Sequence, residues 1–183
     1  MPLKVCWQSW SGELTEHLLL NFSRNAVSAV STIRSDSDRF VVKYSIDCDN
    51  SWVTRQLYIE VEQMGLQKSF RLESNGEGVW TSGSQALTHL YGAIDPDLSA
   101  TPFTNALPIR RLKLKQNQTR DIKVVYITIP ELELSLRNQR YTCIMPHKRY
   151  LFEQPADNFK QEIITDENGL VLDYPMLFKR VKC

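Results

Sequence analysis

The stretch RFVVKYSIDC, residues 39–48, alternates between apolar and polar side chains. One set of alternate positions is apolar throughout, and the other carries most of the polar groups. The first set is Phe40, Val42, Tyr44, Ile46 and Cys48, and the second includes Lys43, Ser45 and Asp47. Side chains of an extended chain point alternately to its two faces, so this pattern predicts a β-strand that buries one face.

The same pattern extends outward from this stretch. Further candidate strands lie at residues 52–62, 66–73, 79–81, 111–115, 122–129, 140–145, 150–153, 159–165 and 170–174. Asn75-Gly76 and Asn168-Gly169 predict tight turns, because both residue types tolerate a positive φ. Residues 12–21 fit a helix or a strand, and the β-like sequence after them favours the strand. The strand at 122–129 has apolar residues on both faces and is expected to be covered on both sides.

Helical periodicity is weak, and one short helix is expected near residues 101–107. Thr101 can cap its start and Pro102 can occupy the first helical position, where a missing amide costs little. Pro108 is expected to limit this helix to about two turns. The predicted fold class is therefore mainly β (α+β), with many short strands and one helix.

Composition describes an ordinary globular chain. The 183 residues carry 22 basic and 21 acidic side chains, giving a net charge of +1, and 42% of the residues are hydrophobic. This balance disfavours a nucleic-acid-binding surface, which usually has a basic excess. A membrane span is not expected, because no apolar run reaches roughly 18 residues. No linker or low-complexity tract divides the chain, so one domain over residues 1–183 is expected.

The N-terminus and the cysteines suggest a cytoplasmic protein. No basic segment followed by an apolar segment marks a secretory signal near the start of the sequence. The four cysteines are spaced singly, without the close pairs of a zinc or redox site. Cys6, Cys48 and Cys143 are therefore interpreted as free thiols of the core, and Cys183 as an exposed thiol. No metal or other cofactor is expected.

Residues 92–112 differ from the rest of the chain. They combine two carboxylates, hydroxyl and amide groups and an arginine pair within a segment rich in proline. Such groups need hydrogen-bond partners when they are buried. The segment is therefore either a structural plug or a binding site.

Several motifs resemble a family of bacterial glycolipid-binding proteins. They are DLSATPFTN at residues 97–105, LPIRRL at 107–112, QRYT at 139–142 and GLVLDYP at 169–175. The resemblance covers nearly the whole chain. It implies a spiral β-roll, a long mixed sheet wrapped around one helix, and a soluble, non-enzymatic protein that binds a lipid or glycolipid in or beside the roll.

The candidate ligand-binding residues each have a structural alternative. Asp97 lies in the polar segment that would select the ligand. Arg110 and Arg111 would point to opposite faces of an extended segment, so that one could grip a head group. The alternative is a salt bridge to Asp95 or Asp97 that joins the helix to the sheet.

Hydroxyl, amide and aromatic groups have the same ambiguity. Thr101, Thr104 and Asn105 could bind sugar hydroxyls or could hold the ends of the helix and turn. Arg140 and Tyr141 could form a polar clamp over a cavity or a buried cross-strand pair. The four tryptophans could stack on sugar rings, but burial in the core is favoured. They are Trp7, Trp10, Trp52 and Trp80.

No recognisable catalytic motif is present. The three histidines are isolated, and the Gly-x-Ser-x-Gly and His-Glu-x-x-His patterns are lacking. Asp95 and Asp97 would point the same way from one strand, unlike the opposed carboxylates of a glycosidase. The alternatives are a hydrolase or isomerase that acts on a carbohydrate or acyl substrate, and a structural or interaction protein. An exposed sheet edge could pair two copies into a homodimer.

Overall fold

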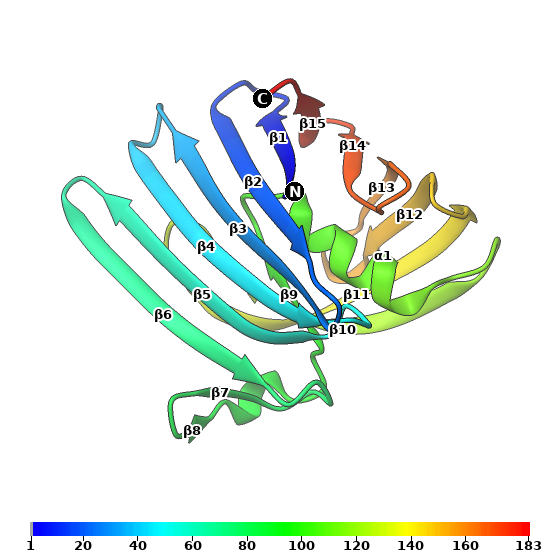
Figure 1. Ribbon diagram of the computed structural model, residues 1–183, viewed down its shortest axis with the longest axis horizontal. Coiled ribbons are helices and arrows are strands. Elements are labelled where there is room, and N and C mark those ends of the chain that lie inside the picture. The colour runs from blue at the N-terminus through cyan, green and yellow to red at the C-terminus, as the bar shows by residue number, and fades with distance from the viewer. Residues whose placement is uncertain (1) are drawn as a thin grey trace.

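Fifteen strands form one continuous, curved sheet in the computed structural model, which describes residues 2–183 (Figure 1). The first eight strands are β1 (Leu3–Ser9), β2 (Leu14–Phe22), β3 (Ala26–Ser35), β4 (Phe40–Asp49), β5 (Thr54–Gln63), β6 (Leu66–Ser74), β7 (Trp80–Ser82) and β8 (Gln85–Ala86). The others are β9 (Asp95–Leu98), β10 (Thr119–Ile127), β11 (Leu134–Met145), β12 (Arg149–Gln154), β13 (Phe159–Thr165), β14 (Val171–Tyr174) and β15 (Phe178–Val181).

The strand order joins the two ends of the chain in the middle of the sheet. It runs β8-β7-β6-β5-β4-β3-β2-β1-β15-β14-β13-β12-β11-β10-β9. The first strand, β1, pairs with the last, β15, and Ser9 lies opposite Phe178. Each neighbouring pair is antiparallel except β9 with β10, which is parallel. The predicted mixed sheet of a β-roll is therefore confirmed.

Both edge strands are short. β8 has two residues, and β9 contains Pro96, which has no amide to donate and suits the edge of a sheet. Short edges that contain proline are a common protection against pairing with another chain. Homodimer formation through a sheet edge stays a prediction.

The chain crosses between the two edges through residues 87–94, which include the short 3-10 helix η1 (Thr88–Leu90). There, the Gly92 amide donates to the Gly78 carbonyl at 2.9 Å. A Cβ atom on Gly78 would lie 2.8 Å from the Gly92 Cα atom. This close approach of two backbones therefore requires glycine. The Trp80 indole anchors the same crossing by donating to the Ala93 carbonyl at 2.7 Å.

The helix lies later in the chain than expected. The 3-10 helix η2 (Phe103–Asn105) leads into α1 (Ala106–Leu112), and Lys113 ends it with a φ of 48°. Pro108 does not limit the helix, because it falls in the first turn, where its missing amide has no intrahelical partner. Residues 111–115 consequently do not form the predicted strand. The other 3-10 helix, η3 (Pro155–Asp157), follows β12.

The N-terminal segment and one of the two Asn-Gly turns form as expected. Residues 12–21 contribute to strand β2, as favoured from the sequence. Asn168-Gly169 turns β13 onto β14, and the backbone amide of Asp166 donates a hydrogen bond to the Leu170 carbonyl in this turn. Asn75-Gly76 opens a longer loop than predicted, because the Asn75 side-chain oxygen accepts hydrogen bonds from the backbone amides of both Glu77 and Val79.

Residues 101–112 fill the inside of the curved sheet (Figure 1). Phe103 and Leu107 belong to the large core cluster formed with the N-terminal strands, and Ile109 belongs to a second cluster on the C-terminal strands. The interior of the roll is therefore packed with side chains. The predicted burial is confirmed for Trp7, Trp52 and Trp80. It is wrong for Trp10, which is 48% exposed in the turn after β1.

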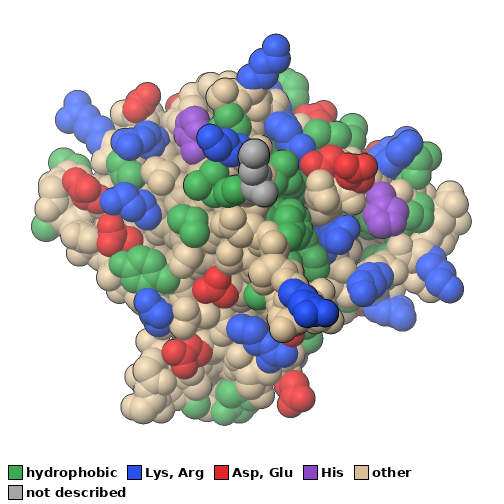
Figure 2. Space-filling model, viewed as in Figure 1, with side chains coloured by type: hydrophobic (Ala, Val, Ile, Leu, Met, Phe, Trp, Pro, Cys, Tyr) green, Lys and Arg blue, Asp and Glu red, His purple; other side chains and the backbone are tan. Residues whose placement is uncertain are grey.

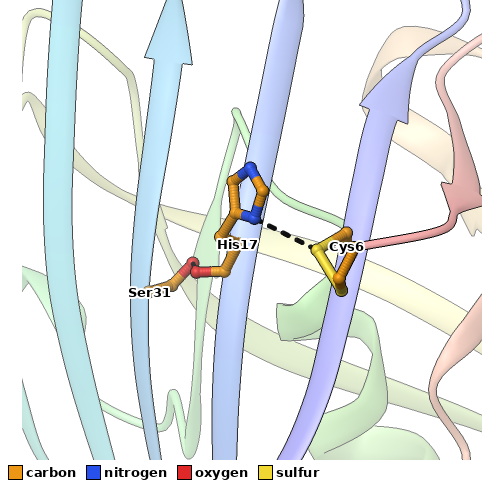
Figure 3. Close-up of a disulfide and its surroundings, with 4 residues drawn as sticks. Cys6, His17 and Ser31 are labelled. Carbon is orange, nitrogen blue, oxygen red and sulfur yellow. Dashed lines mark hydrogen bonds between the residues drawn. A yellow bond between two sulfur atoms is a disulfide. The ribbon is translucent and has the colours of Figure 1, made fainter.

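Two of the four cysteines form a disulfide, which corrects the prediction of free thiols (Figure 3). Cys6 lies on β1, opposite Val181 of β15, and this pairing brings Cys183 within reach. The Cα atoms of Cys6 and Cys183 are 5.3 Å apart. His17 of β2 places its Nδ1 atom 3.2 Å from the Cys6 sulfur. Cys48 and Cys143 are buried free thiols, as predicted.

None of the helices formed by residues 2–183 is long and apolar enough to cross a bilayer.

Candidate ligand-binding cleft

A cavity of about 340 Å³ lies between residues 97–105 and the strands of the C-terminal half. We call this cavity the cleft. Its polar lining is Asp97, Ser99, Thr101, Asn105, Arg137, Gln154 and Asp157. Its aromatic lining is Tyr126, Phe152, Phe159, Tyr174 and Phe178.

Asp97 is held in one orientation on the edge strand β9. Its carboxylate accepts a hydrogen bond from the Thr104 hydroxyl at 3.0 Å and another from the Gln139 amide at 2.6 Å. Burial raises the pKa of Asp97, whereas these two hydrogen bonds and the nearby Arg137 charge act to lower it. Each carboxylate oxygen therefore already has a donor within the protein.

Asn105 is oriented by a buried tyrosine. The Tyr141 hydroxyl donates to the Asn105 side-chain oxygen at 2.9 Å, and the Asn105 amide nitrogen is 3.4 Å from the Pro102 carbonyl. Burial raises the pKa of Tyr141 well above its ordinary value, so its hydroxyl stays protonated and keeps donating. The amide of Asn105 is thus held in place at the cleft surface by two hydrogen bonds within the protein.

A cation lies at the rim of the cleft. The Arg137 guanidinium on β11 donates to Asp157 at 2.8 Å and stacks 4.1 Å from the centre of the Tyr126 ring. The Gln154 amide donates to the same Asp157 oxygen. Arg137 therefore combines a charged donor with a flat stacking surface, which suits a hydroxylated or anionic ligand group.

Aromatic rings form the apolar part of the cleft. Phe152 lies at the centre, with ring centroids 6.1 Å from Phe159 and 6.2 Å from Tyr174. Both pairs have edge-to-face geometry, which is favourable for aromatic rings at these distances. Together they supply the apolar part of the cleft lining.

A buried carboxylate joins the cleft to the N-terminal half of the sheet. Glu16 of β2 accepts a hydrogen bond from Thr101 at 2.6 Å, from Tyr44 at 2.5 Å and from Ser31 at 2.7 Å. Burial raises the pKa of Glu16 to about 7, and the three hydroxyl donors oppose this shift. Glu16 thus anchors the turn that carries Thr101.

The structure brings some of the predicted site residues together. Asp97, Thr101 and Asn105 line the cleft, and Thr104 and Tyr141 lie directly behind it as hydrogen-bond donors. Three predicted arginines lie outside it, namely Arg110, Arg111 and Arg140.

Arg110 and Arg111 lie on α1 and not on an extended segment, because the helix continues past Pro108. Arg111 forms a salt bridge to the fully buried Asp95, with 2.6 Å between Nη2 and Oδ2. The salt-bridge alternative is therefore confirmed for Arg111. Arg110 has no carboxylate partner within the part of the chain that the structure describes, and its guanidinium lies 5.2 Å from the centre of the Trp52 ring.

The clamp of Arg140 and Tyr141 does not form. Neighbouring residues of a strand point to opposite faces, so Tyr141 faces the core while Arg140 faces solvent. Arg140 forms an exposed salt bridge to Asp121 of β10 at 2.6 Å.

Sequence reasoning missed four polar groups of this region: Glu16, Arg137, Gln154 and Asp157. Arg137 could have been found, because it shares the period-two face of Gln139 and Tyr141 on β11. Glu16 lies at a buried position of β2. Its neighbours at alternate positions are apolar, and a carboxylate among them could have indicated a buried functional or structural role. Gln154 and Asp157 lie at the end of a strand and in a short 3-10 helix, and no local pattern marks them.

The curved, mainly β sheet wrapped around one short helix is a β-roll, and a cavity lined by polar and aromatic side chains lies beside that helix. Residues 4–180 match the family described as "Putative glycolipid-binding", and the chain belongs to this family. A DUF1089 family protein from Pseudomonas aeruginosa, known from a crystal structure, has the same fold, with a TM-score of 0.83. It is 33% identical in sequence, and the match covers 91% of this chain and 92% of that one. The comparison with curated proteins finds no match.

Proposed function

We propose that this protein binds a glycolipid by holding its sugar head group in the cleft, without chemical turnover. The observation that carries the proposal is the pairing of preset polar groups with an aromatic wall in one cavity of about 340 Å³. Small-molecule sites usually measure about 300–1,000 Å³, so this cleft suits a compact head group. The family description supports a glycolipid as the ligand.

The acyl chain of such a ligand is expected to leave the cleft. Among residues 2–183, the two core clusters occupy much of the interior of the roll around α1. Leu177 lines the cleft and is 37% exposed, and Met176 next to it is 85% exposed. These two side chains form an apolar rim over which an acyl chain can extend.

The geometry of the carboxylates supports binding without catalysis. A general acid must point its proton at the substrate, and a general base needs a free lone pair toward it. Both oxygens of Asp97 accept hydrogen bonds from the protein, and Asp157 is paired with Arg137 and Gln154. These groups are engaged as structural acceptors, which favours the binding protein over the hydrolase alternative.

The rim cation, Arg137, is expected to contribute to sugar binding. Arg137→Ala is expected to weaken binding of an octyl glycoside about tenfold or more, because a hydrogen bond to a charged group contributes about 1.5–3 kcal/mol. Titration calorimetry with a panel of octyl glycosides below their micelle concentrations measures this change. Arg149→Ala is the matched control, because Arg149 lies on β12 and pairs with Glu162 outside the cleft.

Two results would contradict the proposal. One is that no octyl glycoside binds the unmodified protein, and the other is that Arg137→Ala and Arg149→Ala bind equally well. Thermal melts of both variants show whether the fold is retained. Release of octanol during the titration would instead support the hydrolase alternative.

Location in the cytoplasm also stays a prediction, and the disulfide gives it a test. Disulfides between structural cysteines are rare in the cytosol and common in oxidising compartments. A cytoplasmic protein is therefore expected to have Cys6 and Cys183 reduced in the cell. Rapid alkylation of whole cells followed by mass spectrometry measures this directly, with the buried Cys48 and Cys143 alkylated after denaturation as the internal reference. Unalkylated, disulfide-bonded Cys6 and Cys183 would place the protein outside the cytoplasm.

A further inference from the structure

A second cavity, of about 320 Å³, lies at the other end of α1 from the cleft and shares none of its lining residues. We call it the basic pocket. It is formed by the C-terminal part of α1, the start of β12 and the loops after β4, β11 and β13. Its polar lining is Asn50, Arg110, Lys113, His147 and Tyr150.

The charge of the basic pocket is one-sided. Arg110 and Lys113 contribute cationic groups, His147 adds an imidazole, and no aspartate or glutamate among residues 2–183 lines the cavity. Figure 2 shows blue Lys and Arg side chains and a purple His gathered on the face that carries α1. This charge distribution is complementary to an anion.

Arg110 is held in place but its hydrogen-bonding capacity is largely unused. Among residues 2–183, its buried Nε–H has no partner, and its one hydrogen bond runs from Nη1 to the Glu167 carbonyl at 3.4 Å. The neighbouring Arg111 differs, since it makes three hydrogen bonds to the buried Asp95. The terminal Nη groups, unlike Nε, are not buried, and a guanidinium that presents two such donors to a cavity is suited to bidentate recognition of an oxyanion.

The surroundings fix the position of this guanidinium. The plane of Trp52 supports it on one side, with 5.2 Å between the guanidinium carbon and the ring centre. Gly169 leaves room for the arginine side chain, because a Cβ atom at this position would lie only 2.9 Å from Arg110 Cδ. A larger residue at position 169 would therefore displace the arginine. The basic pocket is thus built to hold Arg110 in one orientation.

A neutral donor completes the pocket. The buried Tyr150 hydroxyl accepts a hydrogen bond from the His147 amide at 3.2 Å, which leaves its own proton free to donate. Burial raises the pKa of Tyr150, so this proton is retained at neutral pH. An anion in the pocket would therefore meet two cationic side chains and one hydroxyl donor.

We propose that the basic pocket binds the phosphate of a phosphomonoester, with Arg110 as the bidentate ligand and Lys113 and Tyr150 as further donors. Phosphate fits this donor set because it is compact, carries about two negative charges near neutral pH and presents three acceptor oxygens. The phosphate belongs either to a soluble ester or to a lipid head group at a membrane surface. This site is independent of sugar binding in the cleft.

Calorimetric titration at about pH 8 tests the proposal, with inorganic phosphate and glycerol 3-phosphate as probes. Both probes are expected to bind with a dissociation constant at or below about 1 mM. Arg110→Gln is expected to weaken binding at least about tenfold. Lys113→Asn provides a second variant, since asparagine tolerates the positive φ at this position while the charge is removed. It is expected to weaken binding severalfold and to leave the melting temperature nearly unchanged.

Co-sedimentation with vesicles separates the two sources of phosphate. Phosphatidylcholine vesicles are compared with vesicles that also contain phosphatidic acid, for the unmodified protein and for Arg110→Gln. Retention only on phosphatidic acid, lost in the variant, assigns a lipid head group, whereas binding of glycerol 3-phosphate alone assigns a soluble ester. Arg137→Ala, at the cleft, is expected to bind phosphate normally, so a failure of this proposal is distinguishable from a failure of sugar binding.

Three outcomes would overturn the proposal. These are no saturable binding of either probe up to about 10 mM, equal binding by the unmodified protein and both variants, or an equal heat from chloride at matched ionic strength.

Discussion

Replacing Arg111 with alanine is expected to lower the free energy of unfolding by about 3–5 kcal/mol. Arg111 is the partner of Asp95, whose side chain is 0% exposed, and the two are joined by three hydrogen bonds. Removal of the guanidinium leaves a buried carboxylate without a compensating charge. Burial already raises the pKa of Asp95, and Arg111 is the group that opposes this shift. Urea unfolding followed by tryptophan fluorescence measures the change.

Two variants show whether the loss comes from the unpaired charge. The double variant Asp95→Leu with Arg111→Met removes both partners and is expected to recover most of the stability, because an apolar pair of similar size can replace a buried ion pair. Arg140→Ala is the exposed control, since its salt bridge to Asp121 lies in solvent and is expected to contribute little. Similar losses for Arg111→Ala and Arg140→Ala would mean that the buried pair does not hold α1 to the sheet.

Stability is also expected to depend on pH through Glu16. Its pKa is about 7 in the folded protein and 4.5 without the fold, so the folded state binds more protons between these two values. The contribution of Glu16 is therefore fully present below pH 4.5 and is lost as the pH rises through about 7. A shift of this size corresponds to about 3 kcal/mol. Asp49 acts in the opposite direction, because its pKa is lowered and its contribution is lost in acid.

Glu16→Gln isolates this effect. Glutamine keeps the shape of the side chain and can accept hydrogen bonds from Ser31 and Tyr44, but it carries no titrating charge. The variant is expected to show a flatter profile of unfolding free energy between about pH 5 and about pH 8 than the unmodified protein. Glu62→Gln, which changes an exposed glutamate on β5, should leave the profile unaltered. Parallel profiles for the unmodified protein and Glu16→Gln would rule out Glu16 as the titrating group.

The candidate site was only partly visible in the sequence. The polar segment that includes Asp97, Thr101 and Asn105 was recognised because its composition differs from that of the surrounding strands. The aromatic lining and the rim cation come from β10 to β15, and their approach to this segment depends on the curvature of the sheet. Alternation along β11 places Arg137 on the same face as Gln139 and Tyr141, which indicates it as a site residue. The same alternation places Arg140 on the opposite face, outside the site.

The sequence by itself determined much of the strand pattern of this protein, but it did not place the helix correctly, because α1 covers part of the predicted strand at 111–115. Alternation of apolar and polar residues sets which strands form and which face each one buries, because side-chain direction in an extended chain follows from backbone geometry alone. Proline at position 96 fits an edge strand, and Asn168-Gly169 fits a turn, for reasons equally local.

Only the tertiary structure decided which distant groups meet. Cys6 and Cys183 are separated by 177 positions and bond because β1 and β15 pair at the middle of the sheet. Glu16 reaches Thr101 and Asp95 reaches Arg111 because the curved sheet encloses residues 101–112. Periodicity carries no information about such pairings, since they follow from burying apolar faces that lie far apart in the chain and from satisfying the polar groups buried with them.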